Sequence, residues 1–118
     1  MAHFVTINCA GIRSKTTLIA DYLQACEVDL ALIQETRLLP AHRNPYIPGY
    51  FTASRHDGGP GPNGGTSGGT LVLAKQGLNV TPVDTSHLPN DCSAVTIRIP
   101  RIGEIAIVSI YISPETTP

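Results

Sequence analysis

The fold of this 118-residue chain is decided by the stretch VDLALIQE, residues Val28 to Glu35. Its apolar residues follow one another without polar alternation, which is typical of a strand covered on both faces. Residues 3–7 form an earlier strand-like run, and between the two the apolar residues recur at helical spacing behind Ser14, a favourable cap. Strand, helix and strand within about 30 residues predict a right-handed βαβ unit. The predicted buried face of the helix comprises Leu18, Ile19, Tyr22, Leu23 and Cys26.

Two polar side chains follow the two strands of this unit. Asn8 comes directly after the first strand and Glu35 directly after the second. Parallel strands end on the same edge of a sheet, where α/β proteins usually place their ligands. A carboxylate beside a carboxamide suits Mg²⁺, which takes one or two carboxylates and keeps several waters. The alternative is that Glu35 merely ends a strand and faces solvent.

The middle of the chain is predicted to be irregular. Prolines and a glycine exclude a helix from Leu38 to Tyr50, where His42 and Arg43 join Arg37 as cationic groups near the predicted edge. Such groups could meet phosphate oxygens, although a solvated loop explains them equally well. We expect a short strand from Tyr50 to Ser54.

The remainder of the chain is predicted to be all-β. Residues Gly58–Gly69 are glycine-rich and read as a flexible loop. Thr70–Lys75 is expected to form a hairpin with Leu78–Val83. Val95–Ile99 alternates apolar and polar residues, whereas Glu104–Ile112 is apolar on both faces and is therefore expected at the centre of a sheet.

Composition limits the classes of function. The length allows one domain, and the net charge of -1 provides no bulk attraction for nucleic acid, so any contact with DNA must be local. Three cysteines without a CxxC pair indicate neither a zinc site nor a disulfide framework. No apolar run approaches the roughly 20 residues needed to cross a membrane, and no signal peptide is recognisable. We therefore expect a nuclear or cytoplasmic protein that is not secreted.

Four sequence blocks resemble the endonuclease/exonuclease/phosphatase superfamily, in order and with matching spacing. They are Ile7–Ile12, Val28–Arg37, Gly68–Leu73 and Ile110–Pro114. The resemblance implies an α+β protein with the four-layer α/β/β/α sandwich of the DNase I-like type. Residues 1–118 would form the amino-terminal half of that domain, because the Asp-x-Asn and Ser-Asp-His motifs of the second half do not occur in the chain.

The blocks most resemble apurinic-like endonucleases of LINE-type (non-LTR) retrotransposons. Repair-type apurinic endonucleases usually carry an aspartate where this chain has Ala10, and retrotransposon enzymes commonly lack it. The resemblance implies Mg²⁺-dependent nicking of target DNA, with Mn²⁺ as a substitute, to prime reverse transcription. The implied partners are DNA, the missing carboxy-terminal half and a downstream reverse transcriptase, and no membrane.

The resemblance also assigns the site residues. Glu35 matches the metal-binding glutamate, Asn8 the asparagine that orients the metal, and Tyr111 the tyrosine that hydrogen-bonds the scissile phosphate. Arg37 is a candidate phosphate contact. Because no general base is recognised, we expect that the chain does not cut alone. The alternatives are a non-catalytic half-domain or pseudo-enzyme that binds DNA or a complementary chain, and a phosphatase relative of the same fold.

Overall fold

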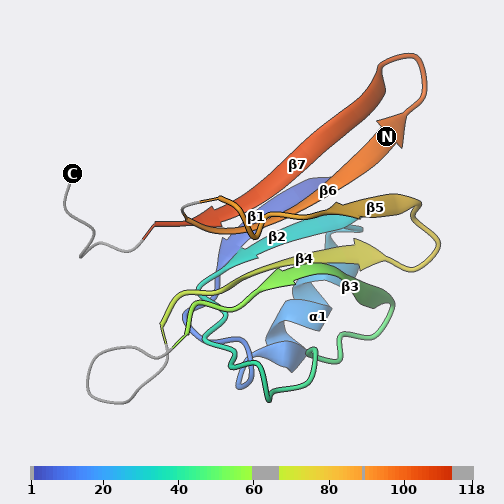
Figure 1. Cartoon of the computed structure of the whole chain (residues 1–118). Coiled ribbons are helices and arrows are strands. Elements are labelled where there is room, and N and C mark those ends of the chain that lie inside the picture. The colour runs from blue at the N-terminus through green and yellow to red at the C-terminus, as the bar shows by residue number, and fades with distance from the viewer. Residues whose placement is uncertain (1, 60–66, 89, 113–118) are drawn as a thin grey trace.

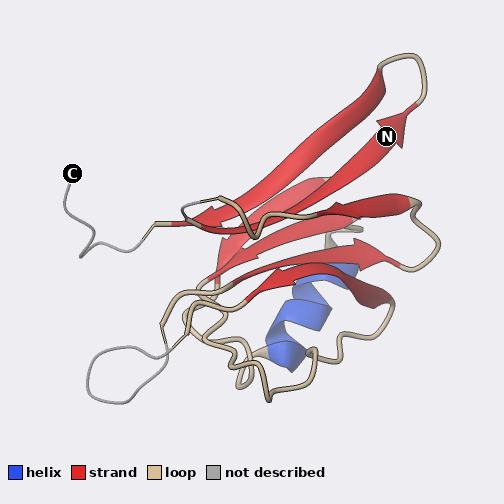
Figure 2. Ribbon diagram, in the orientation of Figure 1, coloured by secondary structure: helices blue, strands red, loops and turns tan. Residues whose placement is uncertain are grey.

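A computed structural model describes residues 2–59, 67–88 and 90–112 of the chain. In this part of the chain one helix and two β-sheets are stacked (Figures 1 and 2). The helix covers one face of the larger sheet, and the smaller sheet covers the other face. The protein is therefore an α+β structure, as the sequence predicted.

The larger sheet has four strands, β1 (Phe4–Asn8), β2 (Leu30–Gln34), β3 (Tyr50–His56) and β4 (Thr70–Lys75). Their order is β1-β2-β4-β3, with β1 parallel to β2 and the other neighbours antiparallel. The βαβ prediction is confirmed. The strand expected from Tyr50 to Ser54 is two residues longer than predicted.

Helix α1 (Thr16–Ala25) packs on the larger sheet, but by a narrower stripe than predicted. Ile19 and Leu23 are buried, whereas Leu18 and Tyr22 are 69% and 46% exposed. The predicted cap is also wrong. The helix begins at Thr16, so Lys15 rather than Ser14 occupies the capping position, and no side chain caps it.

The smaller sheet consists of β5 (Val80–Val83), β6 (Asp91–Ile99) and β7 (Gly103–Tyr111), in that order. Two predictions are wrong here. Strand β5 pairs with β6 and not with β4, because β4 already has β2 and β3 on its two sides. Strand β7 ends the order of the described sheet, and alternate residues on it, including Val108 and Ile110, are exposed.

The two sheets enclose an apolar layer with polar links at one end. Leu30, Val72 and Val95 are fully buried between the sheets. The Gln34 amide donates to Ser109 Oγ (3.0 Å), and that hydroxyl donates to the carbonyl of Ile33 (2.9 Å). These bonds hold the end of β7 over the end of β2, which positions the candidate site.

A few other expectations are settled by the structure. All three cysteines are free, but Cys26 is exposed rather than buried. Within the described residues, α1 falls short of the length and hydrophobicity that a transmembrane helix requires. Residues 60–66, most of the glycine-rich segment Gly58–Gly69, lie outside the described residues, so its flexibility stays a prediction.

Candidate active site

The segments that follow β1 and β2 run side by side at one edge of the larger sheet. The parallel register pairs Asn8 with Gln34, and beyond the strands the Gly11 N–H donates to the Glu35 carbonyl (2.8 Å). The next pair, Ile12 and Thr36, is joined in the same way (3.0 Å). The structure thus brings Asn8 and Glu35 to one edge, as the parallel pairing predicted.

Glu35 has an unusual backbone conformation. Its φ is +59° and that of Arg37 is +57°, values in the left-handed region that side chains other than glycine rarely adopt. A strained backbone of this kind persists only where the surrounding structure holds it in place. Such residues cluster at functional sites. The Glu35 side chain is 18% exposed, and its Oε2 accepts a hydrogen bond from Arg37 Nη2 at 2.8 Å.

The phenol of Tyr111 lies beside this carboxylate. Tyr111 ends β7 and is half-buried. Burial raises the pKa of its hydroxyl above the ordinary value, and the negative charge of Glu35 and a hydrogen bond to it add to the effect. The phenol therefore stays protonated and keeps a proton to donate. Carboxylate, phenol and guanidinium come from two sheets and meet at one rim.

Asn8 is exposed at the same edge but is engaged locally. Its Oδ1 accepts a hydrogen bond from the backbone of Ala10 at 3.3 Å. Lys15 supports this turn, since its ammonium donates to the carbonyls of Cys9 and Ala10 (3.1 Å for the second). Among the described residues, no hydrogen bond joins the side chains of Asn8 and Glu35. Asn8 reaches the predicted edge without contacting the carboxylate directly.

Two glycines support the segment that carries Glu35. The carbonyls of Gly68 and Gly69 accept the N–H groups of Arg37 (2.9 Å) and Thr36 (3.2 Å). Both glycines have positive φ, and a Cβ on Gly69 would collide with Thr36 Oγ1. The two glycines of the block Gly68–Leu73 therefore have a physical role, because residues with a Cβ would not allow the two segments to approach this closely.

The structure adds an imidazole–carboxylate pair that the sequence did not indicate. His56 Nδ1 lies 2.6 Å from Asp91 Oδ1, and Asp91 Oδ2 accepts the N–H of Gly69 at 3.0 Å. Asp91 lies directly opposite Tyr111 in the register of β6 and β7. Thirty-five residues separate the two partners, and the predicted strand began only at Val95, so no local signal could have paired them.

The donor set at the rim suits a hard cation. The Glu35 carboxylate and the Asn8 carbonyl oxygen are the kind of ligands that Mg²⁺ uses together with water and substrate phosphate. The set is partial, because the described residues contain no cluster of three or more His, Cys, Asp or Glu side chains arranged to hold a metal ion. A metal here would depend on water and phosphate oxygens for its other ligands.

Two arginines and a histidine line a cavity next to this edge. Its volume is about 280 Å³, and Arg13, Arg37 and His42 contribute to its walls. Arg13 Nη1 lies 3.1 Å from His42 Nε2. The fold thus brings Arg37 and His42 together with Arg13, which the sequence did not single out. The Nδ1 atom of His42 accepts the N–H of Leu39 at 2.9 Å, and the third predicted group, Arg43, lines a different cavity.

The family of the chain is shown by sequence comparison. The model of the endonuclease/exonuclease/phosphatase family matches residues 5–116. The chain therefore belongs to this family, which includes hydrolytic enzymes of the nuclease and phosphatase types. No curated protein matches the chain.

Proposed function

We propose that the chain carries a Mg²⁺-dependent DNA endonuclease site that hydrolyses a phosphodiester bond. The observation that carries this proposal is the meeting of Glu35, Tyr111 and Arg37 at one rim. A carboxylate for a cation, a protonated phenol and a guanidinium for phosphate oxygens are among the groups that phosphodiester hydrolysis uses.

Each residue has a separate task in this proposal. Glu35, with Asn8 beside it, holds the cation, which when bound neutralises charge on the phosphoryl oxygens and the leaving 3′ oxygen. Mn²⁺ would serve in place of Mg²⁺. Tyr111 donates its hydroxyl proton as a hydrogen bond to the scissile phosphate. With the Glu35 carboxylate engaged by a cation, Arg37 would be free to contact a backbone phosphate.

The cationic cavity supports DNA as the substrate. The net charge of the chain is -1, so attraction to a polyanion depends on local groups. Arg13 and Arg37 supply such groups, and Arg37 contacts Glu35. A DNA strand that crosses the rim would place one phosphate at Glu35 and a neighbouring phosphate in the cavity.

The finer assignment is to the nicking endonucleases of LINE-type retrotransposons. It is supported by Ala10, where repair-type enzymes usually carry aspartate, and it includes a reverse transcriptase as partner and a nuclear or cytoplasmic location. The family also implies the DNase I-like four-layer sandwich. The described residues supply one helical layer and two sheets of that arrangement.

The test is nicking of supercoiled plasmid by the purified chain. The sequence alone predicts that the chain does not cut by itself, because no general base is recognised in it. The His56–Asp91 pair at the rim is a candidate for that base, so we expect Mg²⁺-dependent conversion to the relaxed form, absent in EDTA, and its loss in Glu35→Ala. The Glu104→Ala variant is a matched control, since Glu104 is an exposed carboxylate at the opposite end of β7 from Tyr111. Persistent nicking in Glu35→Ala would contradict the proposal.

Two other outcomes identify the alternatives. Salt-dependent binding of a DNA duplex, with no nicking at any Mg²⁺ or Mn²⁺ concentration, would favour a non-catalytic binding module. Turnover of a soluble phosphomonoester that Glu35→Ala abolishes, again without nicking, would favour a phosphatase of the same fold.

A further inference from the structure

The pair formed by His56 and Asp91 has the geometry of an oriented imidazole. Because the carboxylate only accepts hydrogen bonds, the ring must donate its Nδ1–H to Asp91 Oδ1 across 2.6 Å. In its neutral form the ring then keeps the lone pair of Nε2 free. An aspartate that fixes the tautomer of a histidine in this way is the arrangement that general bases use.

Asp91 is itself held rigidly. Its second oxygen accepts the N–H of Gly69 at 3.0 Å, and its side chain is 15% exposed. A Cβ on Gly68 would collide with the same oxygen. The lack of side chains at Gly68 and Gly69 therefore makes room for the Asp91 carboxylate as well as for Thr36. The segment that supports Glu35 and the carboxylate that orients His56 are therefore parts of one hydrogen-bonded unit.

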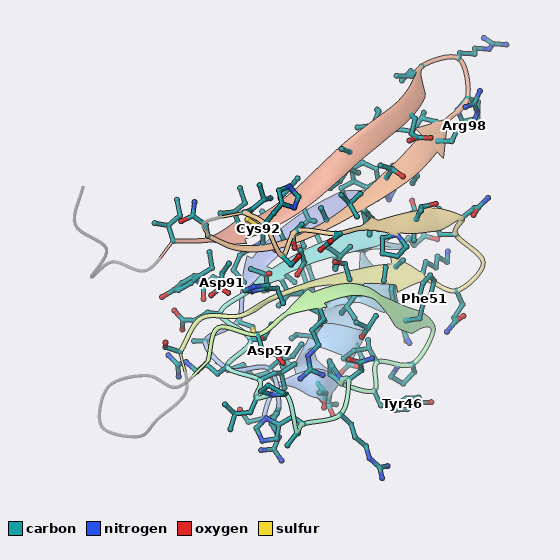
Figure 3. The ribbon with its side chains drawn as sticks, viewed as in Figure 1. Tyr46, Phe51, Asp57, Asp91, Cys92 and Arg98 are labelled. Carbon is teal, nitrogen blue, oxygen red and sulfur yellow. The ribbon has the colours of Figure 1, made fainter. Side chains whose placement is uncertain are left out.

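The pair lies at the same rim as the candidate active site. Asp91 and Tyr111 are directly opposite each other on β6 and β7, and Tyr111 is beside Glu35. His56 ends β3, next to Thr70 in the register with β4. Figure 3 shows Asp91 and Arg98 at opposite ends of β6.

A histidine with a purely structural role would have a buried imidazole, whereas the ring of His56 is partly exposed. The His56 side chain is 38% exposed, and among the described residues no partner is found for Nε2. The charged group in contact with it is Asp91 from β6. Arg55 and Asp57, its neighbours along the chain, pair with each other.

We propose that His56 is a further catalytic residue, a general base oriented by Asp91; this rests on the proposed phosphodiesterase function. Nε2 takes a proton from the attacking water while the water oxygen bonds to phosphorus and the bond from phosphorus to O3′ breaks. The electron pair of that bond stays on O3′, which takes a proton from solvent. His56 then returns its proton to solvent, which leaves a 5′-phosphate and a 3′-hydroxyl.

The first experiment is independent of turnover. Nitrogen-15 NMR of the histidine rings should show His56 with a protonated Nδ1 and a free Nε2. Asp91→Asn should change this pattern, while His3→Gln, at an exposed histidine before the end of β1 opposite Asn8, should not. A short DNA duplex with Ca²⁺ should shift the Nε2 resonance. A ring protonated on Nε2, or an Nε2 resonance that does not shift when DNA is added, would overturn the proposal.

The second experiment measures nicking kinetics. General-base help is worth about 10²–10⁴-fold, so His56→Gln should lower kcat by about a hundredfold or more with little change in KM. Asp91→Asn should lower kcat in the same way, and His3→Gln should match the wild type. A fall confined to KM would instead make His56 a substrate contact and overturn the catalytic role.

The outcomes separate this inference from the function on which it rests. If the wild type nicks DNA and Glu35→Ala does not, but His56→Gln retains full kcat, only the role of His56 fails. If the wild type does not nick DNA, both proposals fail. Thermal melting of each variant distinguishes a loss of chemistry from a loss of folding.

Discussion

Two arginine–carboxylate pairs, each spanning two residues of sequence, serve different purposes in this molecule. Arg55 and Asp57 make two contacts, at 2.7 and 3.1 Å, and both side chains are under 20% exposed. Arg37 and Glu35 make one contact at 2.8 Å, and Arg37 is 46% exposed. The chemical types and the spacing are the same, so sequence alone does not separate them.

The difference lies in what the remaining donors do. Arg55 also donates to the carbonyls of Leu39 (2.7 Å) and His42 (2.9 Å) and to Asn44 Oδ1 (3.0 Å), so it anchors the irregular segment before β3. Among the described residues, Arg37 makes no further side-chain hydrogen bond. One guanidinium is fully committed to the fold, whereas the other retains donors for a ligand.

The two tyrosines divide in the same way. The hydroxyl of Tyr50, buried under α1, lies against the carbonyls of Leu23 and Val28. The hydroxyl of Tyr111 lies at the rim beside Glu35. The same residue type is therefore structural where its polar atoms are hydrogen-bonded to backbone groups and available for function where they are not. Four predictions follow this division.

The largest effect is expected from Glu35→Gly. Loss of the carboxylate should lower nicking by about a hundredfold or more, as removal of one charge-stabilising group does in other sites. Stability should not fall, since glycine relieves the positive φ and the exposed pair contributes only about 0–1 kcal/mol. Nicking assays and thermal melting measure the two effects. A clear drop in melting temperature would make the pair structural.

Arg55→Ala should show the opposite pattern. It leaves Asp57 unpaired and removes three hydrogen bonds to the segment before β3, so we expect a loss of about 2–4 kcal/mol in the free energy of unfolding. Arg98→Ala, at the exposed far end of β6 (Figure 3), should change it by less than about 0.5 kcal/mol. Equal effects of the two substitutions in urea denaturation would contradict the anchoring role.

Tyr50→Phe should cost less, about 1–2 kcal/mol, because the Val28 carbonyl loses its buried partner. Burial, followed by the charge of Asp29, raises the pKa of the Tyr50 hydroxyl. The unfolded phenol ionises first, so stability is lost as pH rises from about 10 through the folded pKa. This alkaline loss should be smaller in Tyr50→Phe than in the wild type. Tyr46→Phe, at an 82% exposed position, is the control.

The sequence predicts those parts of the fold that depend on neighbours in the chain. The continuous apolar run before Glu35 predicts a strand covered on both faces, and the structure covers β2 with α1 on one side and the second sheet on the other. The placement of Asn8 and Glu35 at one edge of the sheet follows from parallel pairing alone. Strand bounds are also close, since Thr70–Lys75 is found as predicted.

What the sequence does not predict depends on packing between sheets. The hairpin of β4 with β5 is locally reasonable but fails because both sides of β4 are occupied. The pair His56–Asp91 forms only when β3 and β6 are stacked, so no spacing of residues along the sequence indicates it. The width of the buried stripe of α1 likewise depends on how far the sheet extends beneath Leu18 and Tyr22. Roles for Asn8, Glu35 and Tyr111 came from family resemblance, and their chemistry stays a prediction.

The smallest effect on folding is expected from Arg37→Ala, which tests the free guanidinium directly. The pair is exposed and makes one contact, so the free energy of unfolding should change by less than about 1 kcal/mol. If Arg37 neutralises one DNA phosphate, the slope of log K against log salt should become shallower by about 0.9. Binding titrations of a duplex at several salt concentrations measure this slope, with Arg98→Ala as the matched control. An unchanged slope would show that the spare donors of Arg37 serve no phosphate, and the contrast with Arg55 would then be one of packing alone.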